Sequence, residues 1–174
     1  MRRITISLLG AALIAMLAIS AFAQKNPRGT SQISLKGKTV SVEYGRPGLN
    51  GRTTEQLLGQ LKPGGVWRMG ADTSTTFKTE ADLAFGSVTV PAGEYSLWMQ
   101  KQDDNSWKLV FNKQHGQWGT KHDAAQDSVS VPLNSPHPAS SVDQVTITLA
   151  KAGAGGEITV EWGTLEEGAR FAAK

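Results

Sequence analysis

The feature that most constrains the fold is an alternation of apolar and polar residues with a period of two. In residues 38–45 (KTVSVEYG) it places Val40, Val42 and Tyr44 on one face. A period of two is typical of β-strands with one buried face. The same alternation predicts further strands at residues 87–90, 95–100, 107–112, 128–133, 142–149 and 157–162.

The segments between these strands are typical of tight turns. Pro91-Ala92-Gly93, Asp103-Asp104-Asn105 and the glycine-rich residues 152–156 each separate two predicted strands. Short strands with such turns predict an all-β fold, a single antiparallel β-sandwich of about 8–10 strands that could be barrel-like.

One segment predicts a short helix, residues 53–61 (TTEQLLGQL). Thr53 or Thr54 could cap its start, and three leucines would form its apolar side: Leu57, Leu58 and Leu61. The following Lys-Pro-Gly-Gly sequence would end it.

The N-terminus predicts export. Two arginines precede an apolar stretch that ends in Ala21-Phe22-Ala23, which is typical of a signal peptide over residues 1–23 cleaved near Ala23. The alternative is an uncleaved membrane anchor, because the stretch could nearly span a bilayer. After cleavage we expect no stable membrane span, and a periplasmic or secreted protein.

The rest of the chain divides into three parts. Residues 24–31 are polar and are predicted to be a flexible leader, residues 32–164 the β-sandwich domain, and residues 165–174 an edge strand or a tail. The chain contains no cysteine, so the fold must hold without disulfides.

The charge balance argues against a nucleic-acid partner. Cleavage would remove Arg2 and Arg3, leaving 16 of the 18 basic residues against 15 acidic residues. No run of lysine or arginine that could follow a phosphate backbone is present in the sequence.

Four segments together resemble the bacterial domain of unknown function 2911 family. They are VSVEYGRPGLNGR (40–52), LKPGGVWRMGADTSTTF (61–77), VPAGEYSLW (90–98) and WKLVFNKQHGQWG (107–119). The resemblance extends from about Ile33 to Trp162. It implies an exported, β-rich single domain, and it implies no particular activity.

Several residues in these segments are suited to binding a small anionic or glycan ligand. A guanidinium group binds carboxylate, phosphate or sulfate, an indole ring can carry a sugar or a planar group, and side-chain amides both donate and accept hydrogen bonds. The predicted ligand-binding residues are Arg46, Arg52, Trp67, Arg68, Asp72, Asn112, Gln117 and Trp118.

A structural role is the alternative for the central pair of these residues. Trp67 would then fill the core, and Arg68 would pair with Asp72 or Glu43. The sequence leaves both interpretations open.

No metal, cofactor or catalytic residue is predicted. His115 and His122, with Asp123 beside the second, match no tight ligand spacing, and the resemblance implies no histidine at either position. His137 lies between two prolines. The sequence lacks a cysteine nucleophile and a Gly-x-Ser-x-Gly elbow. Carboxylates that could act in pairs cannot be matched from sequence: Glu43, Asp72, Glu80, Asp82, Glu94 and Glu161.

These observations favour a non-catalytic binding or envelope-associated module. One alternative is a hydrolase acting on cell-envelope glycans or esters. A second alternative is a structural protein that assembles through an exposed edge strand.

Overall fold

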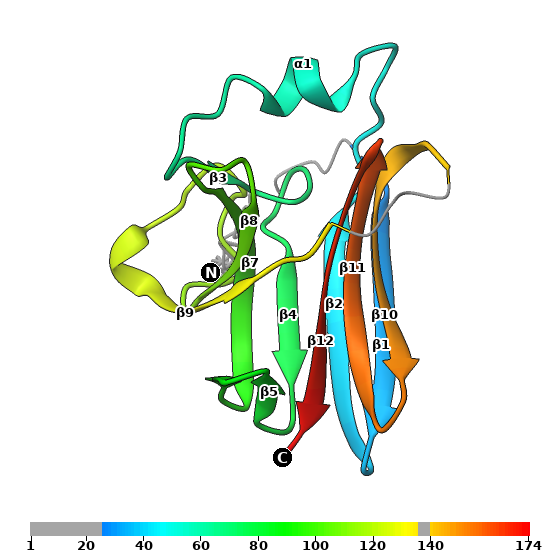
Figure 1. Cartoon of the computed structure of the whole chain (residues 1–174), viewed down its shortest axis with the longest axis vertical. Helices are drawn as coiled ribbons and strands as arrows, with labels where there is room; N and C mark the ends of the chain where they lie inside the picture. The colour runs from blue at the N-terminus through cyan, green and yellow to red at the C-terminus, as the bar shows by residue number, and fades with distance from the viewer. Residues whose placement is uncertain (1–25, 136–139) are drawn as a thin grey trace, which may run out of the picture.

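The computed structural model describes residues 26–135 and 140–174. Two antiparallel sheets pack against each other (Figure 1). The strands are β1 (Arg28–Leu35), β2 (Lys38–Gly45), β3 (Val66–Trp67), β4 (Thr76–Thr79), β5 (Leu83–Phe85), β6 (Val88–Val90), β7 (Gly93–Lys101), β8 (Trp107–Asn112), β9 (Asp127–Pro132), β10 (Val142–Ala152), β11 (Gly155–Gly163) and β12 (Leu165–Ala173).

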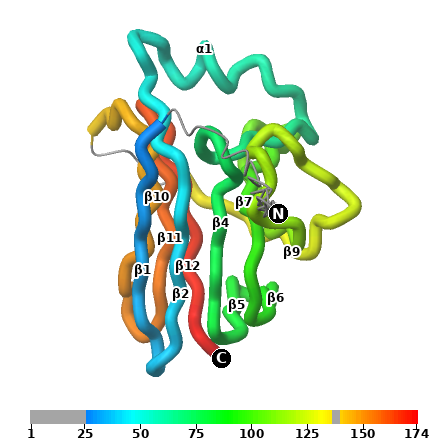
Figure 2. Tube along the Cα trace, turned by 180° about the vertical axis from the view of Figure 1, so that it is seen from behind, coloured from blue at the N-terminus to red at the C-terminus, as the bar shows by residue number. Residues whose placement is uncertain are grey.

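The seven-stranded sheet has the order β1-β2-β4-β7-β8-β9, with β3 paired to β7 outside this path. The five-stranded sheet has the order β10-β11-β12-β5-β6. Strands β1 and β10 lie side by side in both views, where the two sheets meet (Figures 1 and 2). The fold is therefore the predicted all-β sandwich, and the two sheets do not close into a barrel.

The alternating residues of both sheets form one hydrophobic core. Val40, Val42 and Tyr44 are buried, as the pattern of residues 38–45 predicts. From the opposite sheet, Ile158 and Val160 of β11 belong to the same core. Burial of such aliphatic and aromatic side chains is the main favourable term in folding.

Most predicted strands are confirmed, and β2 and β8 have the predicted bounds. The twelve strands of the described residues exceed the predicted 8–10 because several are very short. Strands of two to four residues, such as β3, β4 and β5, contain too few residues for a period to be recognised.

The predicted leader over residues 24–31 extends too far. Strand β1 already begins at Arg28 and pairs with β2 from Arg28 opposite Gly45. Arg28 also forms an ion pair with Glu43 at 3.0 Å. Residues 28–31 are polar because much of this strand stays partly exposed, and the sequence therefore looked like a linker. The predicted signal peptide at residues 1–23 lies outside the described residues.

The segment predicted as an edge strand or a tail at residues 165–174 is a strand, β12, which pairs with β11 from Leu165 to Phe171. On its other side it pairs with β5 only at Ala172 and Ala173. Its buried residues include Glu167, Ala169 and Phe171, which alternate along the strand. A glutamate among the inward-facing residues interrupts the apolar pattern, which weakens the strand signal of this segment.

The predicted helix is a short one, α1 (Thr54–Leu58). Thr53 caps it: its side chain accepts from the Gln56 amide, and the Gln56 side chain accepts from the Thr53 amide. The helix lies across one end of the sandwich, in the connection from β2 to β3 (Figures 1 and 2). Among the helices of the described residues, none has the length and apolar character needed to cross a bilayer.

Candidate functional site

Two of the predicted binding segments meet at the α1 end of the seven-stranded sheet. The Gly119 amide donates to the Asp72 carbonyl at 2.7 Å, and the Ser74 amide donates to the Gln117 carbonyl at 2.9 Å. Thr73 and Trp118 form a β-bridge between them. A Cβ atom at position 119 would lie 2.7 Å from the Asp72 carbonyl oxygen, so this approach requires glycine.

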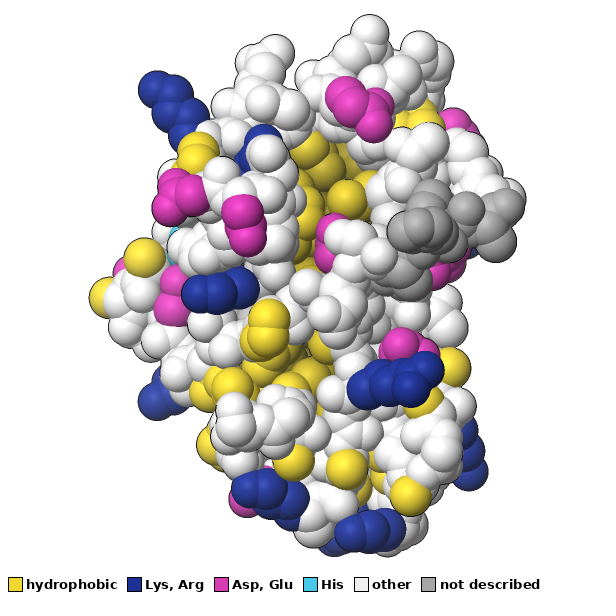
Figure 3. Space-filling view, in the orientation of Figure 1, with side chains coloured by type: hydrophobic (Ala, Val, Ile, Leu, Met, Phe, Trp, Pro, Cys, Tyr) yellow, Lys and Arg dark blue, Asp and Glu magenta, His cyan; other side chains and the backbone are white. Residues whose placement is uncertain are grey.

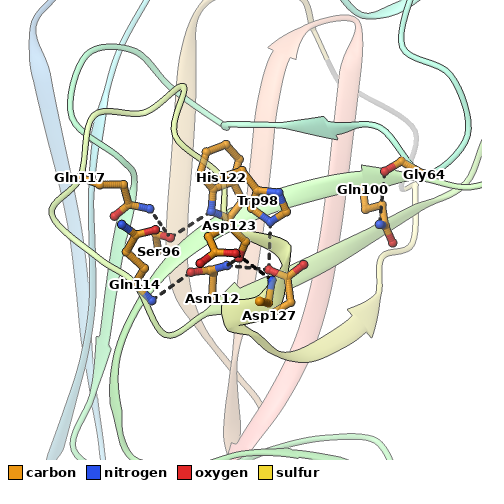
Figure 4. A network of polar contacts seen from close by, with 11 residues as sticks. Gly64, Ser96, Trp98, Gln100, Asn112, Gln114, Gln117, His122, Asp123 and Asp127 are labelled. Atoms are coloured by element: carbon orange, nitrogen blue, oxygen red, sulfur yellow. Dashed lines mark hydrogen bonds and ion pairs between the residues drawn. The ribbon is translucent and has the colours of Figure 1, made fainter.

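Beneath this junction, the outward face of β7 is buried instead of solvated. Ser96 and Trp98 lie on the face opposite Leu97, and both are covered. The Trp98 indole N–H donates to Ser96 Oγ at 2.9 Å, and Gln117 Nε2 donates to the same oxygen at 3.1 Å (Figure 4). Gln117 Oε1 accepts from Ser74 Oγ at 3.2 Å. The Gln117 amide thus holds its loop against the sheet.

Asn112 has a similar structural role. Its side chain is 0 % exposed, and its Nδ2 donates to the Asp123 carbonyl at 2.8 Å and to Asp127 Oδ1 at 2.7 Å. Its Oδ1 accepts from the Gln114 amide at 2.9 Å (Figure 4). With both ends of the amide engaged and no exposure, Asn112 orders the loop and is closed to a ligand.

Trp67 packs as a core residue. Its ring is stacked on Trp162 of β11, with centroids 5.3 Å apart and planes 5° from parallel, and the residue is only 8 % exposed. Stacking between the two sheets ties β3 to the five-stranded sheet. One face of the Trp67 indole is therefore already occupied by protein.

Arg68, the next residue, is half-buried and differs from the other arginines of the described chain. Each of those forms a hydrogen bond or an ion pair: Arg28, Arg46, Arg52 and Arg170. For Arg68, residues 26–135 and 140–174 provide neither. The expected structural partners are engaged elsewhere, since Glu43 pairs with Arg28 and Asp72 accepts from Asn26.

The backbone beside Arg68 adopts an uncommon conformation. Met69 has a φ of 52° and Asp72 a φ of 62°, both in the left-handed region. This region costs a residue other than glycine on the order of 1–3 kcal/mol, and such residues cluster at functional sites. The turn that presents Arg68 is therefore held by its surroundings.

Arg68 lines a surface hollow of about 350 Å³, which we call the Arg68 hollow. Its walls come from α1 and the segment after it, from β3, from β7 and from the loop after β8. They are mostly apolar, and they include no carboxylate. The lining residues are Leu57, Leu58, Leu61, Val66, Trp67, Arg68, Trp98, Gly119, Thr120 and His122.

The two remaining predicted arginines do not line this hollow. Arg46 donates from Nε to the Val145 carbonyl at 3.2 Å and from Nη2 to Thr146 Oγ1 at 3.4 Å, which ties the end of β2 to β10. Arg52 is exposed, and its Nε donates to the Leu49 carbonyl at 3.1 Å. Of the eight predicted binding residues, the structure thus places Trp67 and Arg68 in the hollow, and Asp72, Asn112, Gln117 and Trp118 in the segments that support it.

Sequence reasoning missed His122 as a member of this site. Its Nε2 lies 2.9 Å from Asp127 Oδ1, and its ring packs on the Trp98 indole with centroids 4.7 Å apart (Figure 4). The sequence did carry one signal. Trp98 is a large aromatic residue on the strand face assigned to solvent, which indicates that something covers that face.

Neither a cluster of metal ligands nor two carboxyl groups in one hollow is found in the described part of the chain, although Glu161 and Glu166 lie opposite each other on β11 and β12. No group of three or more histidine, cysteine or acidic side chains there is placed to hold a metal ion. His115 contacts Glu94 at 3.3 Å, and His137 lies outside the described residues. Each of five surface hollows is lined by at most one carboxyl group. The two-carboxylate hydrolase therefore gains no support.

A second hollow lies on the other side of α1. It has a volume of about 320 Å³, and Leu58 lines both it and the Arg68 hollow. Figure 3 shows apolar side chains at its base, below the α1 segment. Its other walls include Lys101, Trp107 and Leu165. The α1 turn therefore has an accessible apolar hollow on each side.

One buried acid lies apart from these hollows. Glu167 of β12 is 3 % exposed, and burial raises the pKa of its carboxyl group. Oε1 accepts from Ser135 Oγ at 2.6 Å, while Oε2 has no partner among the described residues. A buried polar atom without a partner is uncommon and costs stability.

The comparisons with known proteins agree with the resemblance in the sequence. A family profile described as a protein of unknown function (DUF2911) matches residues 26–170. No match was found among curated proteins or among solved structures. Because the profile covers most of the chain, the protein belongs to the DUF2911 family.

Proposed function

We propose that the protein is an exported, non-catalytic binding module that holds a small anionic ligand with an apolar body in the Arg68 hollow. The observation that carries the proposal is that Arg68, a half-buried residue of this hollow, has no acceptor among the described residues. Its guanidinium is therefore left to pair with a carboxylate, sulfate or phosphate from outside the chain.

The walls of the hollow favour an amphipathic anion over a glycan. Leu57, Leu61 and Val66 offer aliphatic surface beside the guanidinium. Sugar binding needs an open aromatic face, whereas Trp67 is only 8 % exposed and Trp98 only 3 %. A carboxylate, sulfate or phosphate that carries an aliphatic chain matches the charge and the walls together.

Binding of octanoate, measured by isothermal titration calorimetry, tests this proposal. We expect saturable binding, weakened about 10- to 150-fold by Arg68→Met, because a hydrogen bond to a charged group contributes about 1.5–3 kcal/mol. The matched control is Arg52→Met, which removes an exposed arginine outside the hollow and should leave the affinity unchanged.

Equal affinities of the wild-type protein and Arg68→Met would show that the guanidinium does not hold the ligand. Absence of binding by octanoate, octyl sulfate and octyl phosphate would overturn the proposal as a whole.

Export is the part of the proposal that rests on the sequence of residues 1–23. N-terminal sequencing of the protein recovered from cells is expected to begin at Gln24, after the small-x-small cleavage motif. Recovery of the intact N-terminus with the membrane fraction would favour the anchor instead.

A further inference from the structure

One nitrogen of the His122 ring has a fixed role. Nε2 lies 2.9 Å from Asp127 Oδ1, and that oxygen also accepts from Asn112 Nδ2 at 2.7 Å. An ionised carboxylate only accepts hydrogen bonds, so Nε2 carries a proton. In the neutral imidazole, Nδ1 is then the unprotonated nitrogen and acts as an acceptor.

The surroundings of the ring leave Nδ1 to a ligand. One ring face packs on Trp98, and the His122 side chain is 15 % exposed while lining the Arg68 hollow. No residue of the described chain forms a hydrogen bond with Nδ1. The charged group at Nε2 is Asp127, and Arg68 lines the same hollow as His122.

The hollow therefore offers two different polar groups to one ligand. Arg68 provides a cation that only donates, and His122 provides an acceptor, while the surrounding wall is mostly apolar. A volume of about 350 Å³ is small enough that one compact ligand can meet both groups. A plain alkyl anion would leave the His122 acceptor without a partner.

We infer that His122 makes the site selective for anions that carry a hydrogen-bond donor next to the anionic group, as in 2-hydroxy carboxylates and N-acyl amino acids. The anionic group would meet Arg68, and the neighbouring O–H or N–H would donate to His122 Nδ1. The aliphatic chain would lie against Leu57 and Leu61. This inference rests on the proposed function, because it concerns the same site.

The test compares octanoate with 2-hydroxyoctanoate, two ligands that differ by one hydroxyl group. Calorimetry at pH 8 gives both dissociation constants. We expect 2-hydroxyoctanoate to bind the wild-type protein about 2- to 10-fold more tightly, as one net hydrogen bond provides.

Two variants separate the roles of the groups. His122→Phe keeps an aromatic ring against Trp98 and should bring the ratio of the two constants to about 1. Arg68→Met should weaken both ligands alike, and Arg52→Met should change neither. A ratio that persists in His122→Phe would overturn the role of His122.

The role of His122 can be tested on the wild-type protein even if His122→Phe does not fold. Its ¹⁵N imidazole spectrum should show a shift of a His122 ring nitrogen on addition of 2-hydroxyoctanoate, and little shift with octanoate. Equal wild-type affinities for the two ligands would overturn this inference and leave the proposed function in place. If neither ligand binds, this inference is overturned, and the absence of binding by octyl sulfate and octyl phosphate as well would overturn the proposed function.

Discussion

The β2–β10 edge of the sandwich and the hollow beside α1 each contain an arginine, and they use it differently. Arg46 donates to the Val145 carbonyl and to Thr146 Oγ1, so its guanidinium joins the two sheets. Arg68 is also half-buried, but no group of the described residues accepts from it. The same side chain is a structural cross-link in one place and a charge without a partner in the other.

The difference between Arg46 and Arg68 shows which polar groups stabilise the fold and which do not. A satisfied buried polar group stabilises the fold, and its removal leaves other atoms without partners. A group that is held without a partner contributes little stability or reduces it, and such groups are often kept for function. If this distinction is correct, substitutions at the two kinds of position should change stability in different directions.

The largest effect is expected at Trp67, which belongs to the architecture although it adjoins Arg68. Trp67→Ala would remove the ring that stacks on Trp162 and leave a cavity. It should lower the free energy of unfolding by about 3–5 kcal/mol. Chemical denaturation measures this loss, with Trp67→Phe as the milder control. A loss below about 1 kcal/mol would mean that the stack is not a core element.

The next effect is expected at Arg46. Arg46→Met keeps the aliphatic stem but loses both hydrogen bonds to β10, and should cost about 1.5–3 kcal/mol. In a domain of this size, each kcal/mol lowers the melting temperature by roughly 2–4 °C. Arg46→Lys is the matched control, because lysine keeps the positive charge but lacks the planar set of N–H donors of the guanidinium. If Arg46→Met left the melting temperature unchanged, Arg46 would not stabilise the fold and would not differ from Arg68 in this respect.

Glu167 is a second group with an atom that lacks a partner among the described residues, its Oε2, and the pH dependence of stability extends the comparison to it. Its pKa is raised by burial, so the folded state holds the proton more tightly than the unfolded state. This group's contribution to stability is therefore full below the unfolded pKa, about 4.3, and is lost as the pH rises through the folded pKa.

Removal of this carboxyl charge should therefore help at neutral pH. Glu167→Gln keeps an acceptor for Ser135 and should be more stable than the wild-type protein at pH 8, by on the order of 1 kcal/mol, with the difference vanishing near pH 4. Melting curves of both proteins across this range give the result. A variant that is less stable at pH 8 would contradict it.

The smallest effect on stability is expected at Arg68. Arg68→Met removes no hydrogen bond or ion pair within the described residues, so the free energy of unfolding should stay within about 0.5 kcal/mol or rise. Thermal and chemical denaturation of Arg68→Met and Arg46→Met, measured side by side, compare the two changes in stability directly. A loss comparable to that of Arg46→Met would make Arg68 architectural as well.

Much of the fold could be predicted from local patterns. Strands β2 and β8, the hairpin turns and the Thr53 cap follow from residues that are neighbours in the chain. The failures have identifiable causes. Glu167 at an inward position interrupts the apolar pattern of β12, so a tail stayed open as an alternative there, and the polar residues of β1 resembled a linker.

The candidate site was predictable only in part. The segments around Trp67 and Trp118 were both predicted to contribute to a site, and the structure brings them together through Asp72 and Gly119. Their individual roles did not follow from residue type. Asn112 and Gln117 order the loop, and His122, which showed no ligand spacing in the sequence, lines the Arg68 hollow.

The sequence by itself determined the longer alternating strands, the sandwich class and the family, because strand periodicity, turns and caps depend on residues close together in the chain. Only the tertiary structure decided which polar groups have partners. Hydrogen bonds such as that from Arg46 to Val145 join residues that are distant in sequence, and whether they form depends on how the sheets pack. The same packing leaves Arg68 without a partner, and the proposed site rests on that difference.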